Sequence, residues 1–208
     1  MNLTASAMTF GLQAFMTLLV ILDPPGATPI FLSLVGEFNA RQRIRMAWQA
    51  SFVSLGVIVA FAIFGRFILN YLHISIYGLQ GAGGLLLLLV SLQLLMGWSS
   101  EKSEIPDKNL ALVPIGTPLL AGPGAIVATM IYVGNAHTFS MKITLGVAIL
   151  AVHAVIALTL MASTKIISII KESGVNLLAR IAGLLLSAIA FQMVIASING
   201  FFHLGVKL

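Results

Sequence analysis

Asp23 is the only acidic residue inside an apolar stretch of this sequence, and it directly precedes two prolines and a glycine. In a lipid bilayer a carboxylate near the centre costs at least about 2.5–3.5 kcal/mol, so an acidic residue there is by default functional. Three roles fit it: a carrier of protons, a ligand for a coupling cation, or the partner of a substrate amine. Alternatively, Asp23 only caps a helix that begins at Pro24, where Asp is favoured. The two kinds of role are compatible.

The prolines after Asp23 interrupt an apolar run that is too long for one span. From Ala5 to Gly36 the run has 32 residues, which is about 48 Å as a single helix at 1.5 Å per residue. The hydrocarbon core is only about 30 Å thick. Pro24 and Pro25 remove two backbone donors, so we expect a discontinuous helix here. In lipid, such a break is tolerated only where it is buried in protein or lines a cavity.

A second segment repeats this pattern, because prolines and glycines also interrupt the apolar run around residues 114–124. A broken helix leaves a positive N-terminal end facing a negative C-terminal end. These two ends fit a small zwitterion, with its carboxylate on the N–H groups and its ammonium on the carbonyls. A single kink would favour a packing role, whereas two related breaks favour a binding site. The candidate substrate-binding residues are Asp23, Pro25, Gly26, Thr28, Thr117, Gly122, Pro123, Gly124, Gln93 and Gln192.

Asp23 is in addition the candidate coupling residue, and neither a metal site nor a cofactor is expected beyond a coupling H⁺ or Na⁺. Gln93 and Gln192 lie in apolar runs, so we expect both amides to face the centre of the protein, as interhelical glue or as substrate contacts. Threonine hydroxyls next to the breaks either line the site or bond back to their own backbone. His153 is a possible proton relay, although an interhelical hydrogen bond is favoured.

The composition places most of this chain in lipid. Of its 208 residues, 59% are apolar and only 8% are charged, against about 25% charged residues in ordinary globular proteins. The mean hydropathy is +1.07. We therefore predict an all-α polytopic membrane protein. Its net charge of +5 is interpreted as a topology signal, not as a sign of nucleic-acid binding, and the lack of cysteine excludes disulfides and thiol chemistry.

Six apolar runs predict six transmembrane helices. A secretory signal peptide is rejected because the N-terminal region lacks Lys and Arg. Eight of the 11 basic residues follow the first, third and fifth spans, which places those loops in the cytoplasm and both termini outside the cell membrane. The expected spans are 1–36 with its break, 46–65, 67–100, 109–141, 143–164 and 181–206.

An internal repeat relates the two halves of the chain at an offset of 98 to 99 residues. Each half, 1–100 and 101–208, holds three spans, so the halves must cross the membrane in opposite senses. This is the inverted-repeat architecture of secondary transporters, with a site near the midplane, and we expect the first and fourth helices to be the discontinuous ones. The matches are 22–27 on 120–125, 35–36 on 133–134, 84–87 on 183–186, and Gln93 on Gln192.

Three stretches resemble the signatures of the MarC family of six-span bacterial and archaeal membrane proteins: 23–31, 118–126 and 180–193. The resemblance covers essentially the whole chain. It implies membership of the lysine-exporter superfamily, transport of small neutral amino acids such as glycine and alanine, and a site formed by discontinuous helices 1 and 4. Family members usually carry Asn where this chain has Ala27, so a polar contact expected there is missing.

We therefore expect a secondary active transporter of small neutral amino acids, coupled to a proton or sodium gradient, with partners limited to the lipid bilayer and the substrate. The alternatives are a passive channel and an exporter for other small solutes, including drugs. An enzyme is not expected, because Asp23 is the only intramembrane Asp and no H-E-x-x-H or G-x-S-x-G motif is present. The sequence leaves the oligomeric state and the direction of transport open.

Overall fold

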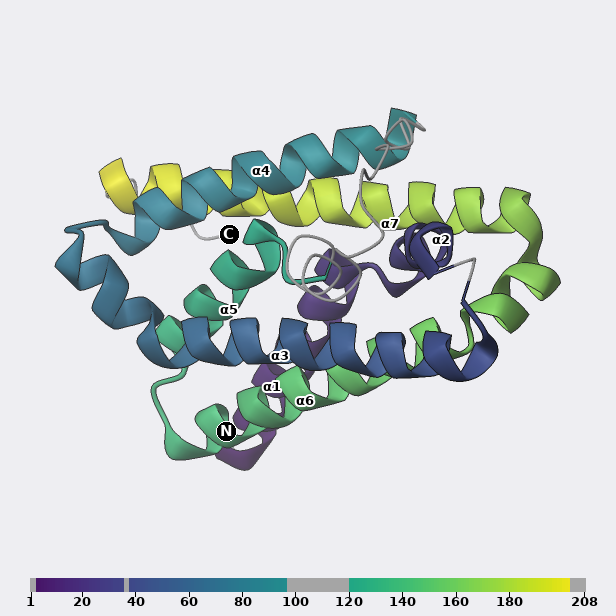
Figure 1. Cartoon of the computed structure of the whole chain (residues 1–208). Helices are drawn as coiled ribbons and strands as arrows, with labels where there is room; N and C mark the ends of the chain where they lie inside the picture. The colour runs from purple at the N-terminus through teal and green to yellow at the C-terminus, as the bar shows by residue number, and fades with distance from the viewer. Residues whose placement is uncertain (1–2, 36–37, 97–119, 203–208) are drawn as a thin grey trace.

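The computed structural model describes residues 3–35, 38–96 and 120–202. Within these ranges the chain is helical and contains no β-strand. Figure 1 shows the helices arranged as one bundle, with α4 and α7 running side by side along one face and α3 and α6 along the other. In chain order the helices are α1 (Leu3–Leu22), α2 (Pro24–Val35), α3 (Ala40–Tyr71), α4 (Ile76–Met96), α5 (Pro123–Asn135), α6 (Phe139–Met161) and α7 (Ser163–Phe202).

Five segments of the described chain are long and apolar enough to cross a membrane: Ser6–Leu32, Ala40–Tyr71, Ile76–Met96, Phe139–Met161 and Asn176–Phe202. The expected fourth span, 109–141, is not among them. Its residues 109–119 lie outside the described ranges, and α5 alone has 13 residues, fewer than the ~20 that a span needs. The described residues therefore contain five candidate membrane spans, and the sixth span remains an expectation.

Large apolar side chains cover the outside of the bundle. Phe67, Ile63 and Leu89 are 70%, 65% and 59% exposed, and they are three of many. Soluble monomers rarely expose extended apolar surfaces, whereas lipid is the natural solvent for them. The predicted class of multi-pass, all-helical membrane protein agrees with this surface.

The turn between the second and third spans lies later than the sequence suggested. We expected a boundary at Arg66, but α3 continues to Tyr71, because a single long cationic side chain on an exposed face does not end a helix. The helix ends instead where His73 adopts a left-handed conformation with φ 55°. The N–H of Ile74 then donates to the carbonyl of Leu69 at 2.9 Å, which is a Schellman-type ending.

The basic segment before the last span is also helical. Residues 165–180 were expected to form a loop, yet α7 runs without interruption from Ser163 to Phe202. The segment contains no proline, so nothing in its backbone chemistry forbids helix. Lys165 and Arg180 therefore lie on a helix, and the apolar part of α7 begins near Asn176.

Glycines allow the helices to approach closely in the interior. Gly83 on α4 is buried against α5, where an added Cβ would lie 2.8 Å from the Cβ of Val127. Gly65 on α3 faces Met130 on α5, with Met130 Cγ at 2.9 Å from the added Cβ. These contacts hold α5 between α3 and α4, which fixes where its N-terminus lies.

We predict that Gly83→Ala destabilises the protein in detergent, while Gly56→Ala does not. Both changes gain the helix propensity of alanine. A Cβ on Gly83 would clash with the Cβ of Val127, whereas a Cβ on Gly56 would meet nothing within 4 Å. Overpacking at Gly83 is expected to cost about 1–3 kcal/mol. Thermal unfolding followed by intrinsic fluorescence or scattering checks this, and equal midpoints for the two variants would contradict the close α4–α5 contact.

Candidate functional site

Asp23 stands at the junction between α1 and α2 with an unusual backbone. Its φ is 40°, in the left-handed region that Asp and Asn tolerate better than most residues. Its N–H still donates to the carbonyl of Leu19 at 3.1 Å, so the chain turns immediately after the last bonded turn of α1. The helical axis is redirected at this one residue.

The Asp23 carboxylate is only half satisfied. It accepts a hydrogen bond from the backbone N–H of Gly26, the third residue of α2, as the side chain of an N-cap residue does. The second oxygen, Oδ1, is buried and has no hydrogen-bond partner. A buried carboxylate oxygen without a partner is costly, so capping alone does not account for the residue.

The first turn of α2 is built tightly around this carboxylate. An added Cβ on Gly26 would overlap Oδ2 of Asp23, which explains why glycine stands there. Thr28 is fully buried, and its hydroxyl donates to the carbonyl of Pro24 at 2.8 Å. The Thr28 hydroxyl thus bonds back to the backbone of its own helix, which is one of the two roles predicted for the threonines next to the breaks. Pro25 lies half-buried on the same turn.

The start of α5 resembles the start of α2. Gly122 is the N-cap, with φ −62° and ψ 162°, and it supplies no side-chain hydrogen bond to the helix. Pro123 occupies the first helical position, which its fixed φ suits, and its ring is exposed. Gly124 is buried, and a Cβ on it would overlap the side chain of Leu87. Thr117 lies outside the described residues.

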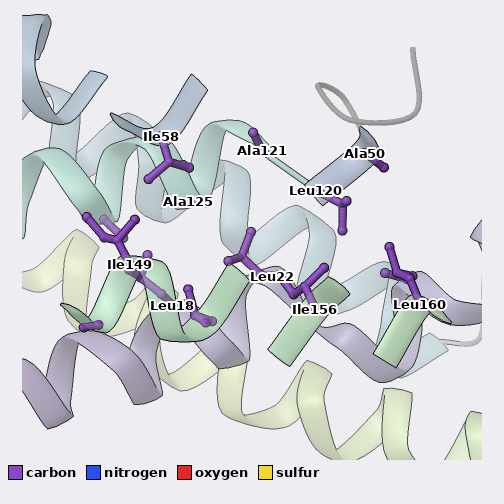
Figure 2. Close-up of a cluster of buried hydrophobic side chains, with 14 of the residues drawn as sticks. Leu18, Leu22, Ala50, Ile58, Leu120, Ala121, Ala125, Ile149, Ile156 and Leu160 are labelled. Atoms are coloured by element: carbon purple, nitrogen blue, oxygen red, sulfur yellow. The ribbon is translucent and has the colours of Figure 1, made fainter. Parts of the chain in front are cut away.

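Residues beside both junctions belong to one hydrophobic core. Leu22 directly precedes Asp23, and Leu120 and Ala121 directly precede Gly122; all three belong to the larger hydrophobic core of the protein. Figure 2 shows them grouped with side chains of α6. The structure therefore brings the two Pro-Gly segments, 98 residues apart in the sequence, to the same part of the interior. The other side chains labelled in this view are Leu18, Ala50, Ile58, Ala125, Ile149, Ile156 and Leu160.

Gln93 and Gln192 do not join this cluster. Both side chains are exposed, so the expectation that they face the centre is wrong. The buried face of α4 carries Gly84, Leu87 and Ser91, and Gln93 follows Ser91 by two residues, or about 200° around the helix. A polar residue in an apolar run indicates that its side chain needs a hydrogen-bond partner, but it does not determine which face of the helix the side chain lies on.

Several buried polar side chains were not anticipated from the sequence. The hydroxyls of Ser51 on α3 and Thr129 on α5 are buried without hydrogen-bond partners, and Thr129 is fully buried. His153 makes the interhelical hydrogen bond that was favoured for it, with Nε2 at 3.1 Å from Oγ of Ser54. Small hydroxyl residues are common in membrane helices. The one sequence signal for this pair is that Ser54 and His153 are equivalent positions of the internal repeat.

Comparison with known proteins agrees with the resemblance seen in the sequence. The model of the MarC family, described as integral membrane proteins, matches residues 8–202. A UPF0056 membrane protein of Methanocaldococcus jannaschii is 36% identical over 194 residues, which are 90% of this chain and 95% of that protein.

More distant relatives match over similar lengths. A UPF0056 membrane protein of Archaeoglobus fulgidus is 31% identical over 197 residues, covering 91% of this chain and 92% of the relative. The UPF0056 membrane protein YvbG of Bacillus subtilis is 30% identical over 209 residues, covering 93% and 96%. No solved structure matches this chain. With a family match across nearly its whole length and relatives that align end to end, the chain belongs to the MarC family of integral membrane proteins.

Proposed function

We propose that this protein is a secondary active transporter of small neutral amino acids of the glycine and alanine class, driven by a proton or sodium gradient. The observation that carries the proposal is the carboxylate of Asp23, which lies at a helix junction inside an apolar span and keeps one buried oxygen without a partner. A group of this kind is expensive in lipid unless a ligand or an ion completes it during function. The proposal assigns no enzymatic activity.

The backbone next to Asp23 supports binding of an ammonium group. Pro24 and Pro25 have no N–H, so the carbonyls of Val20 and Ile21 lack the donor that a continuous helix would supply four residues later. These carbonyls lie at the negative end of α1. Together with Oδ1 of Asp23 they form an acceptor-rich end that suits a primary ammonium or a small monovalent cation.

The start of α5 supports binding of a carboxylate. A helix N-terminus is a positive end that favours anions, and the N-cap of α5, Gly122, has no side chain to occupy it. Leu22, beside the acceptor-rich end of α1, and Leu120, close to this N-cap, are members of one hydrophobic core. A zwitterion is the chemical class that fits both ends at once.

The lack of room at the junctions supports a small side chain on the substrate. Even one added carbon on Gly26 would overlap the carboxylate of Asp23, and one on Gly124 would overlap Leu87. Ala27 is 5% exposed and places a methyl group where relatives were expected to carry Asn. Recognition of the substrate side chain by polar groups is therefore not expected, which favours glycine and alanine over serine or threonine.

The topology that goes with this proposal is two inverted halves, 1–100 and 101–208, with both termini outside the cell membrane. The bias of basic residues supports the orientation. Arg41, Arg43 and Arg45 all lie within the first two turns of α3, at the end that is then cytoplasmic. Alternating access would follow from rocking of one half against the other around the helix breaks.

Purified protein in liposomes is expected to accumulate labelled glycine and alanine above equilibrium when an inward proton or sodium gradient is imposed. Leucine and phenylalanine should not accumulate, because the proposal assigns the site to side chains of the glycine and alanine class. A passive channel would equilibrate these solutes without concentrating them, and it would not respond to collapse of the gradient by an ionophore. Absence of accumulation under both gradients would sink the proposal.

Asp23→Asn is expected to abolish gradient-driven accumulation and to raise KM for alanine by about tenfold or more, since hydrogen bonds to a charged group contribute about 1.5–3 kcal/mol. The variant keeps an oxygen for the N–H of Gly26 and tolerates the positive φ, so its thermal unfolding midpoint should match that of the wild type. That midpoint is the control for folding. Wild-type accumulation by Asp23→Asn would remove the carboxylate from coupling and from amine binding.

A further inference from the structure

The packing of α4 against α7 repeats itself when residue numbers are shifted by 99. A Cβ on Gly84 would lie 2.9 Å from the carbonyl oxygen of Ala190, and a Cβ on Gly183 would lie 3.1 Å from the carbonyl oxygen of Ser91. Shifting Gly84 and Ser91 by 99 gives Gly183 and Ala190, so each contact is the image of the other. The remaining neighbours obey the same shift: Met193 and Val194 beside Gly84, and Leu94 and Leu95 beside Gly183.

The same shift of 99 aligns 84–87 with 183–186 in the sequence. The packing thus provides an independent observation of the same relation. Two helices whose contacts exchange in this way are related by a local two-fold axis that passes between them. Leu87 and Leu186, which are also equivalent, are both buried at this crossing.

A second pair places the axis on the other side of the bundle. Ser54 on α3 and His153 on α6 differ by 99, and they contact each other directly, with Oγ and Nε2 at 3.1 Å. A contact between equivalent residues is its own image and must therefore lie on the axis. The Nδ1–H of His153 donates to the carbonyl of Ile149 at 2.8 Å, which leaves Nε2 of the neutral ring to accept from the Ser54 hydroxyl. Both side chains are buried.

This symmetry has a consequence for transport. In an inverted-repeat transporter, exchanging the conformations of the two halves converts the inward-facing into the outward-facing state. A contact between two residues in one state is then replaced, in the other state, by the contact between their repeat equivalents, which we call its image. If a contact and its image are both present in one structure, both are present in the two states. A contact between two equivalent residues is its own image and is also present in both states. Such contacts do not need to break during the cycle.

We propose that the α4–α7 crossing at Gly84 and Gly183, together with the Ser54–His153 hydrogen bond, forms the fixed pivot of alternating access. The inference rests on the proposed transport function and adds which contacts persist through the cycle. The segments that carry the junctions, α1, α2 and α5, move about this pivot. His153 is in this account a positioning residue that joins the halves, and it does not touch the substrate.

Disulfide staples test the pivot directly, because the chain has no cysteine of its own. The pairs Gly84→Cys/Met193→Cys and Leu94→Cys/Gly183→Cys place Cβ atoms 3.1 and 3.0 Å apart, slightly below the Cβ spacing of about 3.5–4.5 Å in a disulfide, so α4 and α7 must separate by a few tenths of an ångström and the reduced double variants are the reference. Oxidation should crosslink both pairs and leave gradient-driven alanine uptake within about twofold of the reduced protein, because a persistent contact loses nothing when it is fixed.

The contrasting staple joins α1, which leads to the junction at Asp23, to α6 of the other half, at a position nine residues before the axial His153. The pair Gly11→Cys/Thr144→Cys has a Cβ separation of 2.7 Å, and oxidation should abolish uptake until dithiothreitol restores it. Loss of uptake on oxidation of either α4–α7 pair would overturn the pivot, as would full uptake with all three staples. Absence of uptake by the cysteine-free parent under either gradient would instead refute the transport function itself.

An exchange of the two axial residues provides a second test. Ser54→His and His153→Ser alone break the pair, and each should lower the maximal uptake rate by about tenfold without changing KM for alanine. The double variant S54H/H153S restores the pair in mirrored orientation, because Ala50 precedes residue 54 by the same four positions as Ile149 precedes residue 153. Its rate should recover to at least half of the wild type. A double variant that is no faster than the single variants, while monodisperse in detergent, would contradict the axial role of the pair.

Discussion

The structure depends on one constraint: a peptide chain in lipid must satisfy its backbone polar groups internally. Helices meet this constraint everywhere except where proline removes a donor. At Asp23–Pro25 the sequence removes two donors in succession, which leaves the carbonyls of Val20 and Ile21 without helical partners. Oδ1 of Asp23 next to them is also buried without a partner, so unsatisfied acceptors gather at the candidate site.

The rest of the bundle positions this site. Close approach of α5 to α3 and α4 depends on Gly65 and Gly83, and it fixes the N-terminus of α5. Leu22, at the end of α1, and Leu120, just before α5, belong to the same hydrophobic core. Packing in the interior thus links the two short sequence motifs.

Much of this was accessible from the sequence, and the errors have physical causes. Composition predicted helices in lipid. The backbone turns at Asp23, beside the prolines, because proline acts locally on the backbone, whereas a discontinuous fourth helix stays a prediction, since residues 97–119 lie outside the described ranges. Arg66 misplaced a turn, since the end of α3 is set by the left-handed His73 and not by charge. Gln93 was assigned to the wrong face, because residue type does not determine which side of a helix packs. The unpartnered hydroxyl of Thr129 depends on tertiary contacts and left no signal in the sequence.

The contacts of Gly84 and Gly183 can also be described in the terms of quaternary structure. A surface that meets its own copy through a two-fold axis is an isologous interface, and here it is contained within one polypeptide. Two separate half-length chains bearing this surface would dimerise through it if they were inserted in opposite orientations. In the proposed inverted arrangement, recognition between the halves is encoded in the self-complementary faces of α4 and α7, and covalent linkage guarantees that one copy of each orientation is made.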